Sequence, residues 1–175
     1  MEPAPPYRGE GPPALWHVSE DPAIVRFEPR GDGDQLVWAI DTRHLPLYWF
    51  PRDCPRATFW ANSGTDDDDV DRFLAGDRSR RVHVIGAAWL ERMRSTRVFA
   101  YRMPEATFEQ YDRFHVSHET VEPLDVVELG DLLALHAGAG IELRIAPDVL
   151  DLWDKVVNST VDFSGIRLRN ATLSA

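Results

Sequence analysis

The sequence predicts a single α+β domain with a bent sheet, mixed or antiparallel, and a few helices. Many short apolar or alternating runs are interspersed with few helical patterns, which favours α+β over regular βαβ units. At 175 residues with 43% hydrophobic residues, the chain is long enough to bury one substantial core. No repeat or linker divides it. We therefore expect residues 14–175 to form one domain behind a flexible or extended lead-in over residues 1–13, which are rich in Pro and Gly.

Short β-strands are expected along the whole domain, each a brief run bounded by turn residues. The runs are Leu15–Val18, Gln35–Ile40, Val82–Ile85, Val98–Arg102, Phe114–Glu119, Leu124–Leu129, Ile141–Ile145 and an edge strand in the tail Asp162–Ala171. A hairpin-type turn over Gly31–Asp34 is expected to lead into the second of these runs.

Helical patterns are fewer than strand patterns. The clearest is Asp148–Asn158, where five apolar residues follow the i, i+3, i+4, i+7, i+8 stripe of one buried helix face. Further helices are expected at Ala88–Arg94, Glu105–Tyr111 and Asp131–Ala137, the last ending at Gly138. After the second expected strand, prolines interrupt the segment Asp41–Pro55, which we expect to form an ordered, irregular loop with helical turns.

One segment is strongly acidic. Thr65–Asp71 reads TDDDDVD, with five aspartates and one apolar residue. It lacks the central Gly and the terminal Glu of an EF-hand calcium loop. A solvated surface loop is therefore favoured over a metal site.

Composition excludes several classes of function. The formal net charge of -10 disfavours non-specific attraction to nucleic acid or to an anionic membrane. Cys54 is the only cysteine, which excludes a disulfide within the chain and a cysteine-based zinc site, and no metal cofactor is expected. The sequence has no signal-peptide pattern and no apolar run approaching the roughly 20 residues of a membrane span, so we expect a cytoplasmic protein. Gly-rich nucleotide loops and the serine-hydrolase and zinc-protease motifs are also missing.

Candidate functional residues concentrate in the first third of the chain. His17 and Ser19 stand at the end of the first expected strand and share a face if the strand continues. The histidine is suited to bonding a ligand hydroxyl, but a core histidine satisfied by a backbone carbonyl explains the pattern equally well.

The block from Tyr48 to Arg56, YWFPRDCPR, is the second candidate. Arg52 and Arg56 are suited to fork onto a phosphate or carboxylate, whereas the alternative is an Arg–Asp brace through Asp53 that fixes the loop. Cys54 matches no cysteine-hydrolase signature, which favours a small buried residue over a nucleophile.

These segments carry two resemblances. The stretches LWHVSEDPAIVRFEPR, VWAIDTRHLPLYWFPRDCPR and DFSGIRLRNA resemble those of an uncharacterised family of small bacterial proteins, which implies no activity. LWHVS followed by VWAID also resembles the opening of ADP-ribosyltransferase-like domains. In those domains a strand bearing a histidine precedes a turn, a helix and a second strand, and a late strand supplies a glutamate.

The second resemblance implies an ADP-ribosyltransferase-like scaffold with NAD as cofactor. The residues that it implies are His17, Glu119 and Glu122 for catalysis, and Ser19, Trp38, Tyr48, Arg52 and Arg56 for cofactor binding. His17 would contact the adenosine-side ribose, and Trp38 or Tyr48 would stack on the nicotinamide. Glu119, or failing it Glu122, would orient the nicotinamide ribose and stabilise the positive charge that develops as the glycosidic bond breaks.

Two functions from different classes therefore stay open. One is an NAD-using, ADP-ribosyltransferase-like enzyme. The alternative is a non-catalytic binding or interaction protein whose cleft takes a small anionic ligand, a nucleotide or a partner segment, and for which the arginines and aromatics matter but the glutamates do not. A metal-dependent hydrolase built on the scattered histidines is a third, minor interpretation. The sequence does not indicate the substrate or the oligomeric state.

Overall fold

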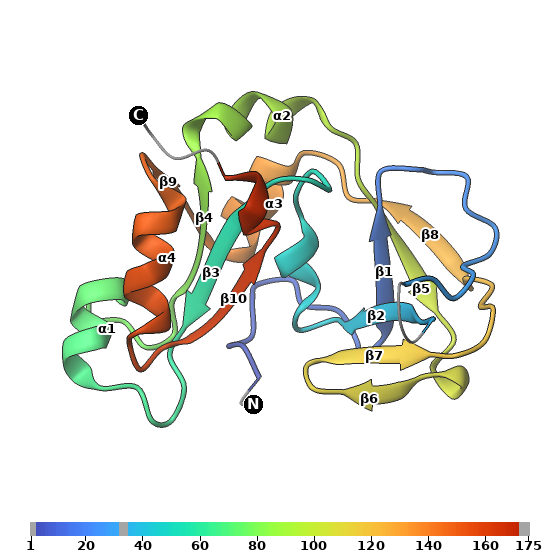
Figure 1. Ribbon diagram of the computed structural model, residues 1–175, viewed down its shortest axis with the longest axis horizontal. Coiled ribbons are helices and arrows are strands. Elements are labelled where there is room, and N and C mark those ends of the chain that lie inside the picture. Colours follow the sequence, from blue (N-terminus) through green and yellow to red (C-terminus); the bar gives the residue numbers. More distant parts are fainter. Residues whose placement is uncertain (1–2, 32–34, 172–175) are drawn as a thin grey trace.

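The protein is an α+β domain in which two sheets lie side by side, as seen in the computed structural model (Figure 1). The structure describes residues 3–31 and 35–171. Most of the turn expected over Gly31–Asp34 therefore lies outside the described residues. The expected single α+β domain is confirmed, but two sheets take the place of one bent sheet.

The larger sheet has the order β6-β7-β2-β1-β5-β8 and is antiparallel throughout. In that order its strands are Glu109–Tyr111, Phe114–Ser117, Val37–Asp41, Leu15–Ser19, Phe99–Met103 and Asp125–Glu128. The smaller sheet has the order β10-β3-β4-β9, with strands Asp162–Ile166, Arg56–Trp60, Arg81–Gly86 and Glu142–Ala146. Only its β4–β9 pair is parallel.

Helices cover the smaller sheet (Figure 1). The α-helices are α1 (Asp67–Leu74), α2 (Leu90–Ser95), α3 (Leu132–Ala139) and α4 (Val149–Val157). Short 3-10 turns are η1 (Leu45–Tyr48), η2 (Ala87–Trp89), η3 (Glu105–Thr107) and η4 (Leu168–Asn170). None of the helices in the described ranges combines the length and apolar character that crossing a bilayer requires.

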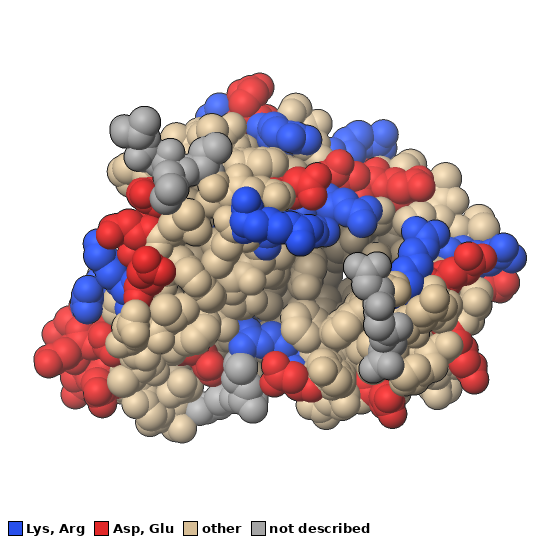
Figure 2. Space-filling model, in the orientation of Figure 1, with Lys and Arg blue, Asp and Glu red and all other residues tan. Residues whose placement is uncertain are grey.

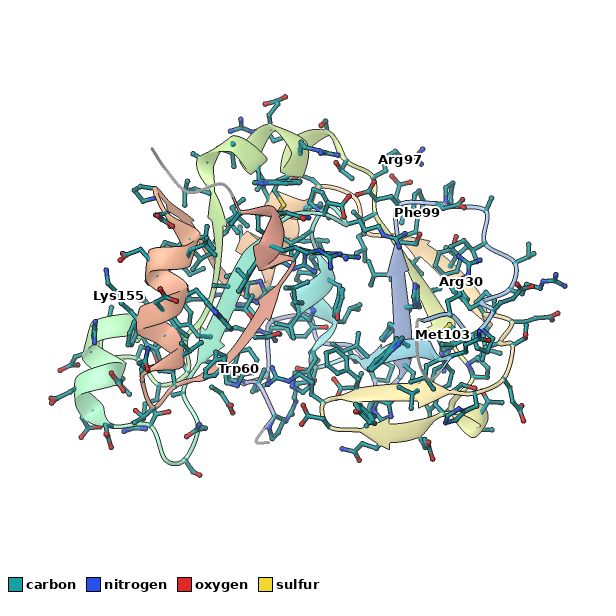
Figure 3. All side chains as sticks on the ribbon, in the orientation of Figure 1. Arg30, Trp60, Arg97, Phe99, Met103 and Lys155 are labelled. Atoms are coloured by element: carbon teal, nitrogen blue, oxygen red, sulfur yellow. The ribbon has the colours of Figure 1, made fainter. Side chains whose placement is uncertain are left out.

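Each sheet alternates its side chains between two apolar clusters. Phe59 and Val82 of the smaller sheet pack against α1 and α4, whereas Trp60 packs in a second cluster that β1 and β2 of the larger sheet share. Phe99 and Met103, which Figure 3 labels at the two ends of β5, belong to a third cluster on the other face of the larger sheet. The larger sheet therefore has apolar packing on both faces, and one face adjoins the smaller sheet.

The strongest sequence pattern folds as expected. α4 begins after Asp148, whose side-chain oxygen accepts hydrogen bonds from the backbone of Leu150 and Asp151, and it runs to Val157. Seven of the eight expected strands are present with ends that differ by no more than two residues, and the tail strand stops five residues early. α3 continues through Gly138 and ends at Ala139, because Gly140 takes the left-handed conformation that terminates a helix.

The acidic segment corrects a prediction. Thr65–Asp71 was expected to be a solvated loop, but α1 begins at Asp67 within it. Aspartates in the first turn are favourable because the N-terminal end of a helix carries partial positive charge. Asp69 also accepts hydrogen bonds from the backbone N and the hydroxyl of Thr160, both at 2.7 Å, and these bonds lower the pKa of its carboxyl.

Two further expectations are corrected. The helix expected over Glu105–Tyr111 is confined to η3, and its second half forms strand β6 against β7. The tail strand ends at Ile166, because Arg167 adopts a left-handed backbone with φ 56° and η4 follows.

Several residues of the described lead-in, residues 3–13, contact the rest of the domain. Ala4 is fully buried and its N–H points at His44 Nε2. The Tyr7 hydroxyl donates to the carbonyl of Thr42, at 3.0 Å, and the Arg8 N–H donates to the carbonyl of Ala139. Ala4 and Tyr7 also join the apolar cluster around Trp49 and Trp60, a contact that the Pro and Gly content of the segment does not indicate.

Candidate functional site: a pocket between the two sheets

A pocket of about 410 Å³ lies where the two sheets meet. Figure 2 shows a hollow near the middle of this face with Lys and Arg atoms along its upper rim. The pocket is lined by β1 and the turn after it, by η1 and the loop that follows, and by the end of β10. Its lining residues are His17, Val18, Ser19, Glu20, Tyr48, Phe50, Arg52, Arg56, Val98, Gly165, Ile166 and Arg167.

Arg56, the first residue of β3, is a buried guanidinium in the pocket wall with 2% of its surface exposed. Its Nε donates to the carbonyl of Leu47 at 2.8 Å, and its Nη1 donates to the carbonyl of Cys54 at 2.9 Å. The guanidinium carbon also lies 5.4 Å from the ring centre of Tyr48 and 4.9 Å from that of Phe50. These contacts fix the orientation of the guanidinium.

No described carboxylate forms an ion pair with Arg56, and Nη2 has no hydrogen-bond partner among the described residues. Burial lowers the pKa of Arg56 to about 10, so the group is still protonated at neutral pH. A buried cation without a counter-ion is costly to the fold. Its position in a pocket wall makes the guanidinium accessible to an anion that enters the pocket.

Two more arginines line the same pocket. Arg52 has an exposed side chain that forms no ion pair with a described residue. Arg167 comes from the end of β10 and lies 3.9 Å, Nε to Oδ1, from Asp53. The Arg–Asp brace considered for the loop is therefore formed by Arg167. Arg167 is not among the site residues predicted from the sequence, because only the three-dimensional fold brings β10 to this loop.

His17 lies where β1 and β2 separate. The two strands pair only at Leu15↔Asp41 and Trp16↔Ile40, and beyond these pairs His17 Nδ1 lies 2.7 Å from the carbonyl oxygen of Trp38. A carbonyl only accepts, so Nδ1 carries the proton and Nε2 is left as an acceptor. Burial lowers the pKa of the His17 imidazole. The hydrogen bond to the Trp38 carbonyl raises this pKa in part, and the positive charge of Arg52 lowers it further. His17 is therefore a neutral acceptor at the junction.

A second pocket of about 160 Å³ adjoins the first and occupies the opening between the strands. It shares His17, Val18 and Tyr48 with the first pocket, and its other walls are Trp16, Trp38, Ala39, Ile40 and Phe114. Trp38 lies edge-on to Phe114, with ring centres 5.6 Å apart. The walls are mainly apolar and aromatic, which suits a planar ring.

The structure brings together most of the candidate residues and leaves two apart. His17, Ser19, Tyr48, Arg52 and Arg56 line the larger pocket, and Trp38 lines the smaller one. Glu119 and Glu122 lie exposed between β7 and β8 and line neither pocket. Glu20, which is not among the predicted site residues, is the acidic side chain among the described residues of the larger pocket's wall.

Other reactive groups in the described residues stand apart from this pocket. Cys54 is buried, and burial raises the pKa of its thiol to about 12. No group of three or more His, Cys, Asp or Glu side chains in the described ranges is placed to hold a metal ion. The arginines of the larger pocket suit contacts with an anion, and the aromatic walls of the smaller pocket suit a planar ring.

Comparison with known proteins places the chain in a family but adds no activity. No curated protein and no solved structure matches it. Residues 16–171, which include every pocket residue named above, match a family of unknown function. Since the match spans most of the chain, the protein belongs to the DUF6886 family.

Proposed function

We propose that this protein binds a small phosphorylated ligand with an aromatic ring, of the nucleotide type, in the pocket between its two sheets. The observation that carries the proposal is Arg56, a buried guanidinium in the pocket wall that lacks a counter-ion among the described residues. A bound phosphate would supply the missing charge and accept from the unpaired Nη2.

The neighbouring groups fit the same ligand. Arg52 and Arg167 line the pocket with Arg56 and add positive charge in a protein whose formal net charge is -10. Local clustering of this kind steers an anion to one place despite the overall charge. Among the described residues, the three arginines form one ion pair, the 3.9 Å contact of Arg167, and a half-exposed contact at that distance is weak.

The ring and the sugar of a nucleotide also find suitable partners. The apolar opening lined by Trp38 and Phe114 offers edges and faces to a planar ring. His17, a neutral acceptor at the junction of the two pockets, is placed to accept from a ligand hydroxyl. NAD and AMP both combine these three chemical parts.

Isothermal titration calorimetry with AMP, NAD and pyrophosphate tests the proposal. We expect binding that weakens as salt is added, and Arg52→Gln and Arg56→Lys should each raise Kd by about tenfold or more. Arg94→Gln is the matched control, since Arg94 is exposed on α2 and does not line the pocket. If none of the three ligands binds the wild type at millimolar concentration, the proposal is wrong.

A second candidate is transfer of ADP-ribose from NAD, as the ADP-ribosyltransferase-like resemblance implies. It is favoured by the position of His17, which lines both the larger pocket with the arginines and the smaller, aromatic pocket. Glu119 and Glu122 would have to approach the bound ribose, because neither lines the pockets. Release of free nicotinamide from NAD that is lost in His17→Ala supports transfer. Binding of NAD without release leaves the protein a nucleotide-binding module.

A further inference from the structure

Glu20 stands out because it is an acidic side chain inside a pocket of three arginines. It is the one Asp or Glu among the described residues that line this pocket. Even so, it forms no ion pair within 4 Å with Arg52, Arg56 or Arg167. A carboxylate so close to an anion site repels phosphate and lowers its affinity, so its presence there calls for a separate role in ligand binding.

The Glu20 carboxylate is held in one direction. Its Oε1 accepts from the backbone N–H of Arg52 at 2.7 Å, which ties the turn after β1 to the loop after η1. Its Oε2 has no partner among the described residues, and an ionised carboxylate has lone pairs for further donors. Glu20 is exposed and lines the pocket, so this oxygen is open to a ligand that binds there.

The turn that carries Glu20 is itself fixed. The Ser19 hydroxyl accepts from the N–H of Asp21 at 3.1 Å, and the Asp21 carboxylate accepts from the N–H of Ala23 at 2.9 Å. The buried Tyr101 donates its hydroxyl proton to the carbonyl of Asp21, at 2.6 Å. An acceptor on a turn held from both sides is preorganised for a ligand.

The donors that suit such an acceptor are hydroxyl groups next to a phosphate. A vicinal diol offers two O–H donors to one carboxylate, and a carboxylate on a ribose hydroxyl is a recurrent means of reading dinucleotides. We propose that Glu20 accepts hydrogen bonds from the ribose diol of the ligand and makes the pocket selective for ribonucleotides. This inference rests on the proposed nucleotide binding and names the substrate class within it.

The test compares three ligands on the wild type and on Glu20→Gln. The glutamine keeps an amide oxygen for the Arg52 N–H but loses the negative charge. The wild type should bind AMP at least about tenfold more tightly than 2′,3′-dideoxy-AMP. In Glu20→Gln this preference should fall to within about threefold, whereas pyrophosphate should bind as well as before or more tightly, because a repulsive charge is gone.

Glu20→Ala separates ligand recognition from loop positioning. This substitution also removes the hydrogen bond from the Arg52 N–H. If Glu20 only holds the loop, Glu20→Ala should weaken the binding of AMP, dideoxy-AMP and pyrophosphate together. Glu20→Gln should then leave the affinity for all three ligands unchanged. That pattern, or equal affinity of the wild type for AMP and dideoxy-AMP, overturns the proposal for Glu20. If Arg56→Lys still weakens AMP binding in that case, the proposed nucleotide binding in this pocket stands without a role for Glu20. Absence of all binding instead overturns the pocket itself.

Discussion

His83 Nδ1 lies 3.1 Å from His136 Nε2 in the core, joining strand β4 to helix α3. His136 Nδ1 faces the carbonyl of Leu132 at 2.7 Å and must donate to it, so its Nε2 accepts and His83 Nδ1 donates. His83 Nε2 is then a buried acceptor without a partner among the described residues. Both imidazoles are neutral in this arrangement, and protonation of both would set two N–H donors against each other at the His83–His136 contact.

Acid should therefore destabilise the fold between pH 6.5 and about pH 4. Burial lowers the pKa of His136 to about 4 and holds that of His83 well below 6.5. Below pH 6.5 both histidines bind protons in the unfolded chain, whereas in the folded chain they stay neutral until a lower pH. The free energy of unfolding therefore falls as the pH falls. His136 alone should lower the free energy of unfolding at pH 5 by roughly 2 kcal/mol relative to its value at pH 7.

Urea unfolding of the wild type at pH 7 and pH 5 measures this loss. The double variant His83→Leu, His136→Leu removes both groups and should show a much flatter pH dependence. His118→Gln, at an exposed histidine, is the control and should behave as the wild type does. Equal pH dependence in the double variant and the wild type would contradict this account.

The secondary structure that local pattern determines was predictable. The five-residue apolar stripe of α4 and the short runs of β4 and β9 are periodic signals that tertiary packing only reinforces. Contacts between distant segments were not. Nothing in the sequence pairs His83 with His136, and nothing brings Arg167 to the loop of Arg52 and Asp53.

The acidic segment shows why local polarity misled. Four consecutive aspartates are typical of a solvated loop, but α1 needs only Val70, Phe73 and Leu74 to pack against the smaller sheet. Those residues lie at and beyond the end of the acidic run, and the helix N-terminus tolerates the charge that precedes them. The candidate site was predictable as a location, through His17 and the arginines, but its walls depended on the meeting of two sheets.

Gly165→Ala should destabilise the fold by about 1–3 kcal/mol. A Cβ at this position in β10 would lie 2.6 Å from Leu168 Cδ1 and 2.6 Å from Trp153 Cη2, closer than carbon atoms approach. Gly138→Ala is the matched control, because a Cβ at Gly138 meets nothing within 4 Å and the residue lies inside α3. We expect the control to gain about 0.5–1 kcal/mol. Chemical denaturation compares the two, and similar effects would contradict the packing argument.

Cys54 should react with thiol reagents only when the protein unfolds. Its side chain is fully buried, and burial raises the pKa of the thiol to about 12, which leaves almost no thiolate at neutral pH. Modification by a chromogenic disulfide at pH 7.5 should therefore be slow in buffer and fast in denaturant. A rapid reaction of the native protein would instead reopen the nucleophile interpretation that the sequence left as the alternative.

Arg167 offers a test in which stability and ligand binding move apart. Its φ of 56° and ψ of 23° place it in the left-handed region, which costs a non-glycine residue about 1 kcal/mol or more. Glycine adopts this backbone without that cost. Arg167→Gly should therefore be more stable than Arg167→Ala by about 1 kcal/mol in urea unfolding.

Both variants remove the same guanidinium from the pocket wall. Both should therefore bind pyrophosphate and AMP about tenfold more weakly than the wild type, and by the same factor. Wild-type affinity in Arg167→Gly would exclude Arg167 from the ligand site, and equal stability of the two variants would exclude backbone strain.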